Sequence, residues 1–264
     1  MMASDTTTGT TQTATESFGF GPTLIRRHGA GPRTLFLHGA HFPTAWLPFH
    51  DALAERTSLT APVHPGYESG VVPDWLRSVD DYAMHYRELL GDGAHLVGYD
   101  LGAWIAATLA AYYPDRVRSF TAVCPYGLRM PDAPPLEFLG CDPTRYEAAL
   151  FNGPAGDHAP LLGNRREPAG FAELYGQNSV TARLIWERHY DVRLAHRLAL
   201  VTAPALVIGA KDDRLTSPAH AHGWAALLPS ARLVMIDHAG HAAVVTHPAS
   251  VASEILACIK EVER

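Results

Sequence analysis

The feature that most constrains the fold is a strand, a sharp turn and a helix within residues 95–107. The stretch opens with an apolar run, passes through a turn in which Gly98 and Gly102 flank Asp100, and continues as an alanine-rich helical sequence. Two small residues allow a tight, strained connection that lifts one side chain above a sheet, with the N-terminus of the helix beneath it. We therefore expect Asp100 to be the functional centre of an α/β protein.

Two further signals lie on either side of this turn. The strand-like residues 34–37 end in His38-Gly39, and Asp212-Asp213-Arg214 is followed by a segment that ends in His241. From about residue 18 onward the chain resembles the α/β-hydrolases, in which the turn residue, an acid and a histidine follow one another in this order. The resemblance implies an α/β fold with a mostly parallel central sheet, flanking helices and an inserted helical lid.

Composition divides the chain into a tail, a core and an insertion. Residues 1–17 are mostly Thr, Ser, Ala and Gly, so we expect a disordered tail. Residues 129–195 hold many prolines, glycines and charges, and they fall where the α/β-hydrolases insert a lid. We therefore assign residues 18–128 and 196–264 to the hydrolase core and residues 129–195 to the lid.

Charge and cysteine content limit the partners that we expect. The net charge of −6 gives no reason to expect nucleic acid or an anionic membrane, and no apolar run reaches the roughly 18 residues of a membrane span. Three scattered cysteines fit neither a disulfide framework nor a zinc site, and we find no signal peptide. We expect a cytoplasmic monomer or homodimer that acts on a small molecule without a metal or other cofactor.

An aspartate at the turn changes the chemistry that a serine would perform there. A carboxyl group with a pKa near 3.9 is already an anion at neutral pH, so Asp100 needs no base to attack an sp3 carbon. The product is an ester on Asp100, which water activated by His241 would hydrolyse. An acid behind His241 would orient its ring; we choose Asp213, with Asp212 as the second candidate.

The resemblance also implies an oxyanion hole. Its backbone N–H donors would come from Leu101 and from Ala40 or His41 in the loop after residues 34–37. We include His38 and Trp46, from the same region, among the candidate substrate-binding residues, although packing is the main alternative for Trp46.

Two reaction classes use an aspartate in this position by resemblance, epoxide hydrolysis and dehalogenation. Haloalkane dehalogenases usually carry a tryptophan directly after the nucleophile, where this chain has Leu101. An epoxide oxygen needs an acid, commonly a tyrosine of the lid. The candidates are Tyr190, which we rank first, Tyr146 and Tyr175. We therefore place epoxide hydrolysis before dehalogenation.

Other interpretations of Asp100 stay open. Apart from Asp100, the chain resembles serine-type esterases and carbon–carbon hydrolases more closely. A biosynthetic enzyme or a small-molecule binder on such a scaffold could use Asp100 as a general base or an electrostatic anchor. The aspartate could also be a substitution of a catalytic serine.

Overall fold

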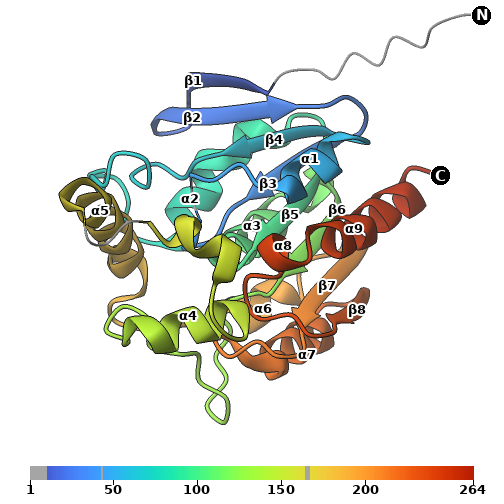
Figure 1. Ribbon diagram of the computed structural model, residues 1–264. Coiled ribbons are helices and arrows are strands. Elements are labelled where there is room, and N and C mark those ends of the chain that lie inside the picture. The colour runs from blue at the N-terminus through green and yellow to red at the C-terminus, as the bar shows by residue number, and fades with distance from the viewer. Residues whose placement is uncertain (1–10, 43, 164–166) are drawn as a thin grey trace, which may run out of the picture.

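A computed structural model of the protein describes residues 11–42, 44–163 and 167–264. Within these ranges, eight strands form a single sheet in the order β1-β2-β4-β3-β5-β6-β7-β8 (Figure 1). The pairs β1–β2 and β2–β4 are antiparallel, and every later pair is parallel. The strands are β1 (Gln12–Phe18), β2 (Gly21–His28), β3 (Arg33–Leu37), β4 (Ser58–Pro62), β5 (Ala94–Tyr99), β6 (Val117–Val123), β7 (Ala205–Ala210) and β8 (Ala231–Ile236).

Helices cover both faces of this sheet. On one face α1 packs against α8 and α9, and on the other α3 packs against α2 and α6, with α7 beside β7 and β8. The expected α/β-hydrolase fold, with a mostly parallel sheet between helices, is thus confirmed. The α-helices are α1 (Pro48–Ala54), α2 (Val79–His85), α3 (Leu101–Tyr112), α4 (Pro143–Phe151), α5 (Pro168–Ile185), α6 (Leu194–Leu198), α7 (Ser217–Leu227), α8 (Ala243–Thr246) and α9 (Pro248–Val262). Short 3₁₀ helices are η1 (Tyr86–Leu90), η2 (Pro114–Arg116) and η3 (Gly156–Leu162).

The central strands β5 and β7 are buried along their whole length. Helices shield both of their faces, so these strands are mostly apolar and do not alternate with polar residues; the buried His95 of β5 is hydrogen-bonded to Ser119 and Glu263. The core that results fixes the ends of the parallel strands, from which the loops around Asp100 emerge.

The segment between β6 and β7 contains α4, η3, α5 and α6. Figure 1 shows α4 and α5 on the same side of the molecule, to the left of the sheet. Asp142 caps α4, because its carboxylate accepts hydrogen bonds from the N–H groups of Thr144 and Arg145. The expected insertion therefore has helical structure of its own.

The first strand differs from the expected disordered tail over residues 1–17. Gln12–Phe18 forms β1, which pairs with β2 from Gln12 opposite Arg27 to Phe18 opposite Gly21. Backbone pairing with β2 and packing of the Phe18 ring, 4.8 Å from that of His85, stabilise a segment whose composition alone predicts no order. The part of the predicted tail in residues 1–10 lies outside the described residues.

Within the described residues, none of the helices combines the length and the apolar character that crossing a membrane requires.

The turn after β5 requires glycine at position 102. A Cβ atom on Gly102 would lie 2.0 Å from the carbonyl oxygen of Leu37, and one on Gly98 would lie 2.4 Å from the carbonyl oxygen of Gly102. Since these neighbours are backbone atoms, they cannot move aside without shifting β3 or α3. The two glycines therefore let α3 start directly against the sheet.

We expect Gly102→Ala to lower the free energy of unfolding by about 3 kcal/mol, because the added methyl group overlaps the backbone of β3. Gly140→Ala is the matched control, since nothing lies within 4 Å of its Cβ position, and it should change stability by no more than about 0.5 kcal/mol. Urea unfolding of both variants measures the difference. Equal stability of the two would contradict the close approach at Gly102.

Candidate active site

Asp100 occupies the turn between β5 and α3 in a strained conformation. Its φ is 53° and its ψ −120°, a region that residues with a Cβ seldom adopt. Hydrogen bonds on both sides hold this geometry: the Asp100 N–H donates to the carbonyl of Val123 at 3.0 Å, and the Asp100 carbonyl accepts from Ala103 at 3.0 Å. The turn thus projects the carboxylate from the end of the sheet, as the sequence predicts.

Two backbone N–H groups hold the Asp100 carboxylate, which is only 1% exposed. The N–H of Ala40 donates to Oδ2 at 2.8 Å, and the N–H of Leu101 also hydrogen-bonds the carboxylate. These are two of the three positions predicted to form an oxyanion hole. The donors thus contact the side chain of the turn residue itself.

His241 lies on the other side of the carboxylate. Its Nε2 is 3.4 Å from Oδ1 of Asp100, and its Nδ1 is 2.8 Å from Oδ2 of Asp213. Asp213 is fixed in turn by the N–H groups of Leu215 and Thr216 and by the Thr216 hydroxyl, which donate to its carboxylate. The structure therefore brings Asp100, His241 and Asp213 together, and of the two neighbouring acids it is Asp213 that contacts His241.

Asp100, His241 and Asp213 stabilise one another's charged forms. Burial lowers the pKa of His241, but the charge of Asp213 and the carboxylate of Asp100, 3.4 Å from Nε2, outweigh it and raise the pKa to about 10. Burial raises the pKa of Asp100, yet the neighbouring His241 imidazole outweighs burial, so the net shift of the Asp100 pKa is downward. At neutral pH the site consequently holds an imidazolium between two carboxylates.

His41 also faces Asp100, through its side chain. The imidazole is 4% exposed, its Nε2 lies 3.9 Å from Oδ2 of Asp100, and its Nδ1 shares a hydrogen bond of 2.6 Å with the hydroxyl of Tyr146 on α4. The sequence indicates His41 only as a backbone donor. The available signal is its place in the loop after His38-Gly39.

Tyr146 is the predicted tyrosine that the structure brings to this site. Tyr190, ranked first from sequence, pairs through its backbone with Gly127 and lies under the guanidinium of Arg129. Tyr175 is on α5 with 67% of its surface exposed.

The side chains of His38 and Trp46 make packing and hydrogen-bond contacts within the loops around the site. His38 accepts a hydrogen bond from the N–H of His64 at 2.8 Å, and the two rings lie 3.7 Å apart. Trp46 donates to Asp51 at 2.8 Å and stacks on His50. These contacts favour packing over substrate binding for both residues.

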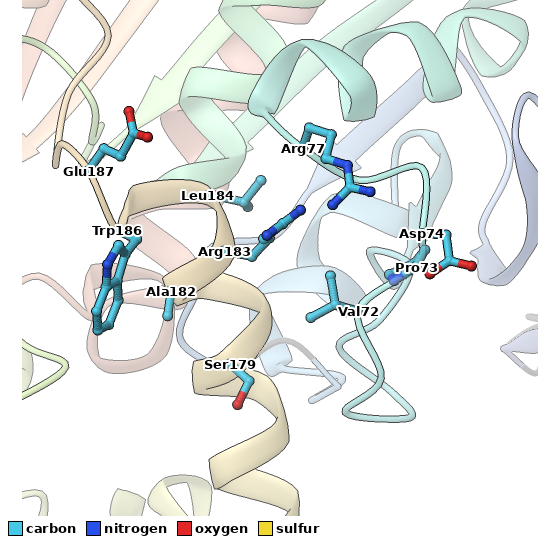
Figure 2. A pocket seen from close by; sticks show the side chains of 10 residues that line it. All are labelled: Val72, Pro73, Asp74, Arg77, Ser179, Ala182, Arg183, Leu184, Trp186 and Glu187. Carbon is cyan, nitrogen blue, oxygen red and sulfur yellow. The ribbon is translucent and has the colours of Figure 1, made fainter.

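Two cavities differ in their relation to Asp100. A cavity of about 210 Å³ is lined by Ala40, His41 and Tyr146 and by residues of η3 and α5. A larger cleft of about 810 Å³ lies between residues 72–77 and the C-terminal part of α5, where Arg77 and Arg183 point towards each other (Figure 2). Since no predicted site residue lines the larger cleft, we assign the smaller cavity to the site.

Metal binding would compete with the protonation of His241. His41, Asp100 and His241 have ligand atoms within 4.8 Å of one another, as do Cys124, Asp213 and His241. A metal ion in either group would have to displace the proton that two carboxylates hold on His241.

Asp213 should control the charge of His241. We expect the His241 imidazole to titrate near pH 10 in the wild-type protein and at lower pH in Asp213→Asn, as followed by ¹⁵N NMR of histidine-labelled protein. Because the folded-state pKa exceeds the ordinary value of 6.5, this group stabilises the fold fully below pH 6.5, and that stability is lost as pH rises through about 10. Asp212→Asn is the control and should leave the titration unchanged; a wild-type midpoint near 6.5 would contradict the charged triad.

Two proteins are similar to this chain in sequence over most of its length. The chain is 30% identical over 260 residues to polyketide synthase ThaQ of Burkholderia thailandensis, a match that covers 91% of this chain but only 12% of that protein. It is 26% identical over 243 residues to RutD of Agrobacterium fabrum, which is named as a carbamate hydrolase, with 86% of this chain and 88% of that protein covered.

Solved structures extend the likeness of fold. The 2-hydroxy-6-oxo-6-phenylhexa-2,4-dienoate hydrolase of a Rhodococcus species aligns with a TM-score of 0.70 at 18% identity, over 95% of this chain and all of that one (100%). At this identity the likeness shows the fold alone. The model of the alpha/beta hydrolase family matches residues 34–254, and the chain therefore belongs to the alpha/beta hydrolase family.

Proposed function

We propose that the protein hydrolyses a small organic epoxide through a covalent ester on Asp100. The observation that carries this proposal is the position of the Asp100 carboxylate: the backbone N–H of Ala40 donates to Oδ2 at 2.8 Å, and Oδ1 faces Nε2 of His241 at 3.4 Å. One oxygen is thus oriented by a fixed backbone donor, and the other is next to the imidazole that would transfer protons.

In the first step Oδ1 of Asp100 attacks an epoxide carbon. A carbon–oxygen bond forms to Asp100 while the ring carbon–oxygen bond breaks, and the resulting alkoxide takes the proton from the His241 imidazolium. The enzyme then holds a neutral hydroxyalkyl ester beside a neutral His241.

In the second step His241 takes a proton from water, and the hydroxide attacks the ester carbonyl of Asp100. The N–H groups of Ala40 and Leu101 stabilise the oxyanion that forms. When this intermediate collapses, the diol alkoxide leaves and takes the proton of the new carboxyl group. Asp100 returns as a carboxylate, and His241 keeps the proton with which the cycle began.

The protonation of His241 favours an epoxide over an alkyl halide. Ring opening needs a proton for the alkoxide, and the resting imidazolium carries one next to Oδ1. Halide departure needs no proton, so His241 would remain protonated and would first have to lose that proton to solvent before activating water. Dehalogenation is therefore the weaker candidate.

The segment between β6 and β7 would act as the lid in this function. Tyr146 on α4 contacts His41, and η3 and α5 line the cavity beside it. We propose that this segment encloses the substrate above Asp100 and selects it by shape.

Complete burial of the ion pair favours a second candidate, a non-hydrolytic enzyme or a small-molecule binder. His241 is 0% and Asp100 1% exposed. A charge pair shielded from water in this way could anchor a polar ligand without admitting the water that hydrolysis needs.

Replacing the base should trap the ester. We expect His241→Gln, incubated with terminal and aryl epoxides, to gain the mass of one epoxide on the peptide that contains Asp100. The ester should form more slowly than in the wild-type protein, because the imidazolium proton is absent. It should nevertheless persist, because glutamine cannot activate water. Intact-protein mass spectrometry followed by peptide mapping measures this adduct.

Two comparisons make this trapping experiment decisive. Asp100→Asn in the same background should gain no mass, and wild-type protein should release diol and show no lasting adduct. If His241→Gln stays unmodified with every epoxide and alkyl halide while such compounds raise its unfolding temperature, the second candidate is favoured.

A further inference from the structure

We propose that His41 donates a hydrogen bond from Nε2 to the leaving oxygen of the substrate, and that Tyr146 fixes the imidazole tautomer required for this. The inference rests on the proposed function and assigns the side chain of His41 to its first step.

The Nε2 atom of His41 is a buried polar atom without a partner. It has no hydrogen-bond partner among the described residues, although His41 is only 4% exposed. A buried donor in this state is unfavourable and calls for an explanation, of which a catalytic role is one. Oδ2 of Asp100 lies 3.9 Å away, which is beyond hydrogen-bond distance.

The neighbours of His41 select one tautomer. A carboxylate only accepts hydrogen bonds, so Asp100 favours the form in which Nε2 carries the hydrogen. The Tyr146 hydroxyl then donates to Nδ1 over the 2.6 Å between them. The opposite tautomer would direct a nitrogen lone pair at the Asp100 anion.

His41 lies where a substrate bound at Asp100 would place its leaving oxygen. Its ring centroid is 5.7 Å from that of His241, in an edge-to-face arrangement, and both imidazoles face the Asp100 carboxylate. His41 and Tyr146 also line the 210 Å³ cavity. A substrate that enters from this cavity and presents its carbon to Asp100 thus places the adjoining oxygen near His41.

The two histidines would then have different tasks. Burial lowers the pKa of His41 to about 4, although the Asp100 charge opposes this, and the neutral imidazole is therefore favoured near pH 7. A neutral imidazole stabilises developing negative charge by donating a hydrogen bond and keeps its proton. His241 supplies the proton that is transferred to the leaving oxygen. This arrangement suits an oxygen leaving group, which accepts hydrogen bonds strongly.

The test measures ester formation in the His241→Gln background, with styrene oxide and 1,2-epoxyhexane as probes. Adding His41→Phe keeps a flat ring but removes the donor, and we expect ester formation to slow about 100-fold. Adding His41→Gln keeps an N–H near the position of Nε2 and should stay within about tenfold of the parent. Tyr146→Phe should slow the step about tenfold, because the tautomer is no longer fixed.

The outcomes separate the inference from the proposed function. Ester formation at the parent rate in His41→Phe, or equal slowing by His41→Phe and His41→Gln, would overturn the donor role. If His41→Phe fails to fold, an unchanged rate in Tyr146→Phe overturns it instead, and a slowed Tyr146→Phe with a near-parent His41→Gln supports it. Absence of any ester in the His241→Gln parent would remove the proposed function, and this inference with it.

Discussion

The site depends on keeping one carboxylate charged away from water. An isolated buried anion is very unfavourable, so Asp100 at 1% exposure requires compensating groups around it. The loop after β3 supplies the Ala40 N–H, the start of α3 supplies the Leu101 N–H, and the loop after β8 supplies His241. Because these loops leave different strands, the register of the parallel sheet sets the distances on which the charge relies.

The sequence predicts those parts of the site that short motifs encode. The turn around Asp100 needs glycines within two residues on each side, and the order of Asp100, Asp213 and His241 follows the chain, so both are visible without a structure. Three tyrosines in the inserted segment look alike in sequence. Tertiary packing alone distinguishes Tyr146, which meets His41 across 105 positions of the chain. No periodicity or spacing encodes such a contact.

The expectation of a disordered tail was wrong for Gln12–Phe18, which form β1, for a related reason. Composition describes what a segment can bury by itself, and Gln12–Phe18 has few apolar side chains. Its stability comes from pairing with β2, with Gln12 opposite Arg27 and Phe18 opposite Gly21, and from an ion pair of Glu16 with Arg27 across the hairpin. Such a strand is ordered only because it pairs with its neighbour, so the composition of one segment does not predict it.

The charges also explain how one histidine could serve both steps of the proposed reaction. Two carboxylates hold the proton on His241 while burial opposes it. Ester formation would neutralise Asp100 and leave only Asp213, so the balance shifts towards the neutral imidazole at the moment when a base is needed. Hydrolysis would restore the carboxylate, and with it the preference for the imidazolium. The Ala40 donor need not move in this cycle, because Oδ2, which it holds in the resting carboxylate, becomes the oxyanion during hydrolysis. A change in the charge of Asp100, with little movement of the backbone, would therefore switch His241 from proton donor to base.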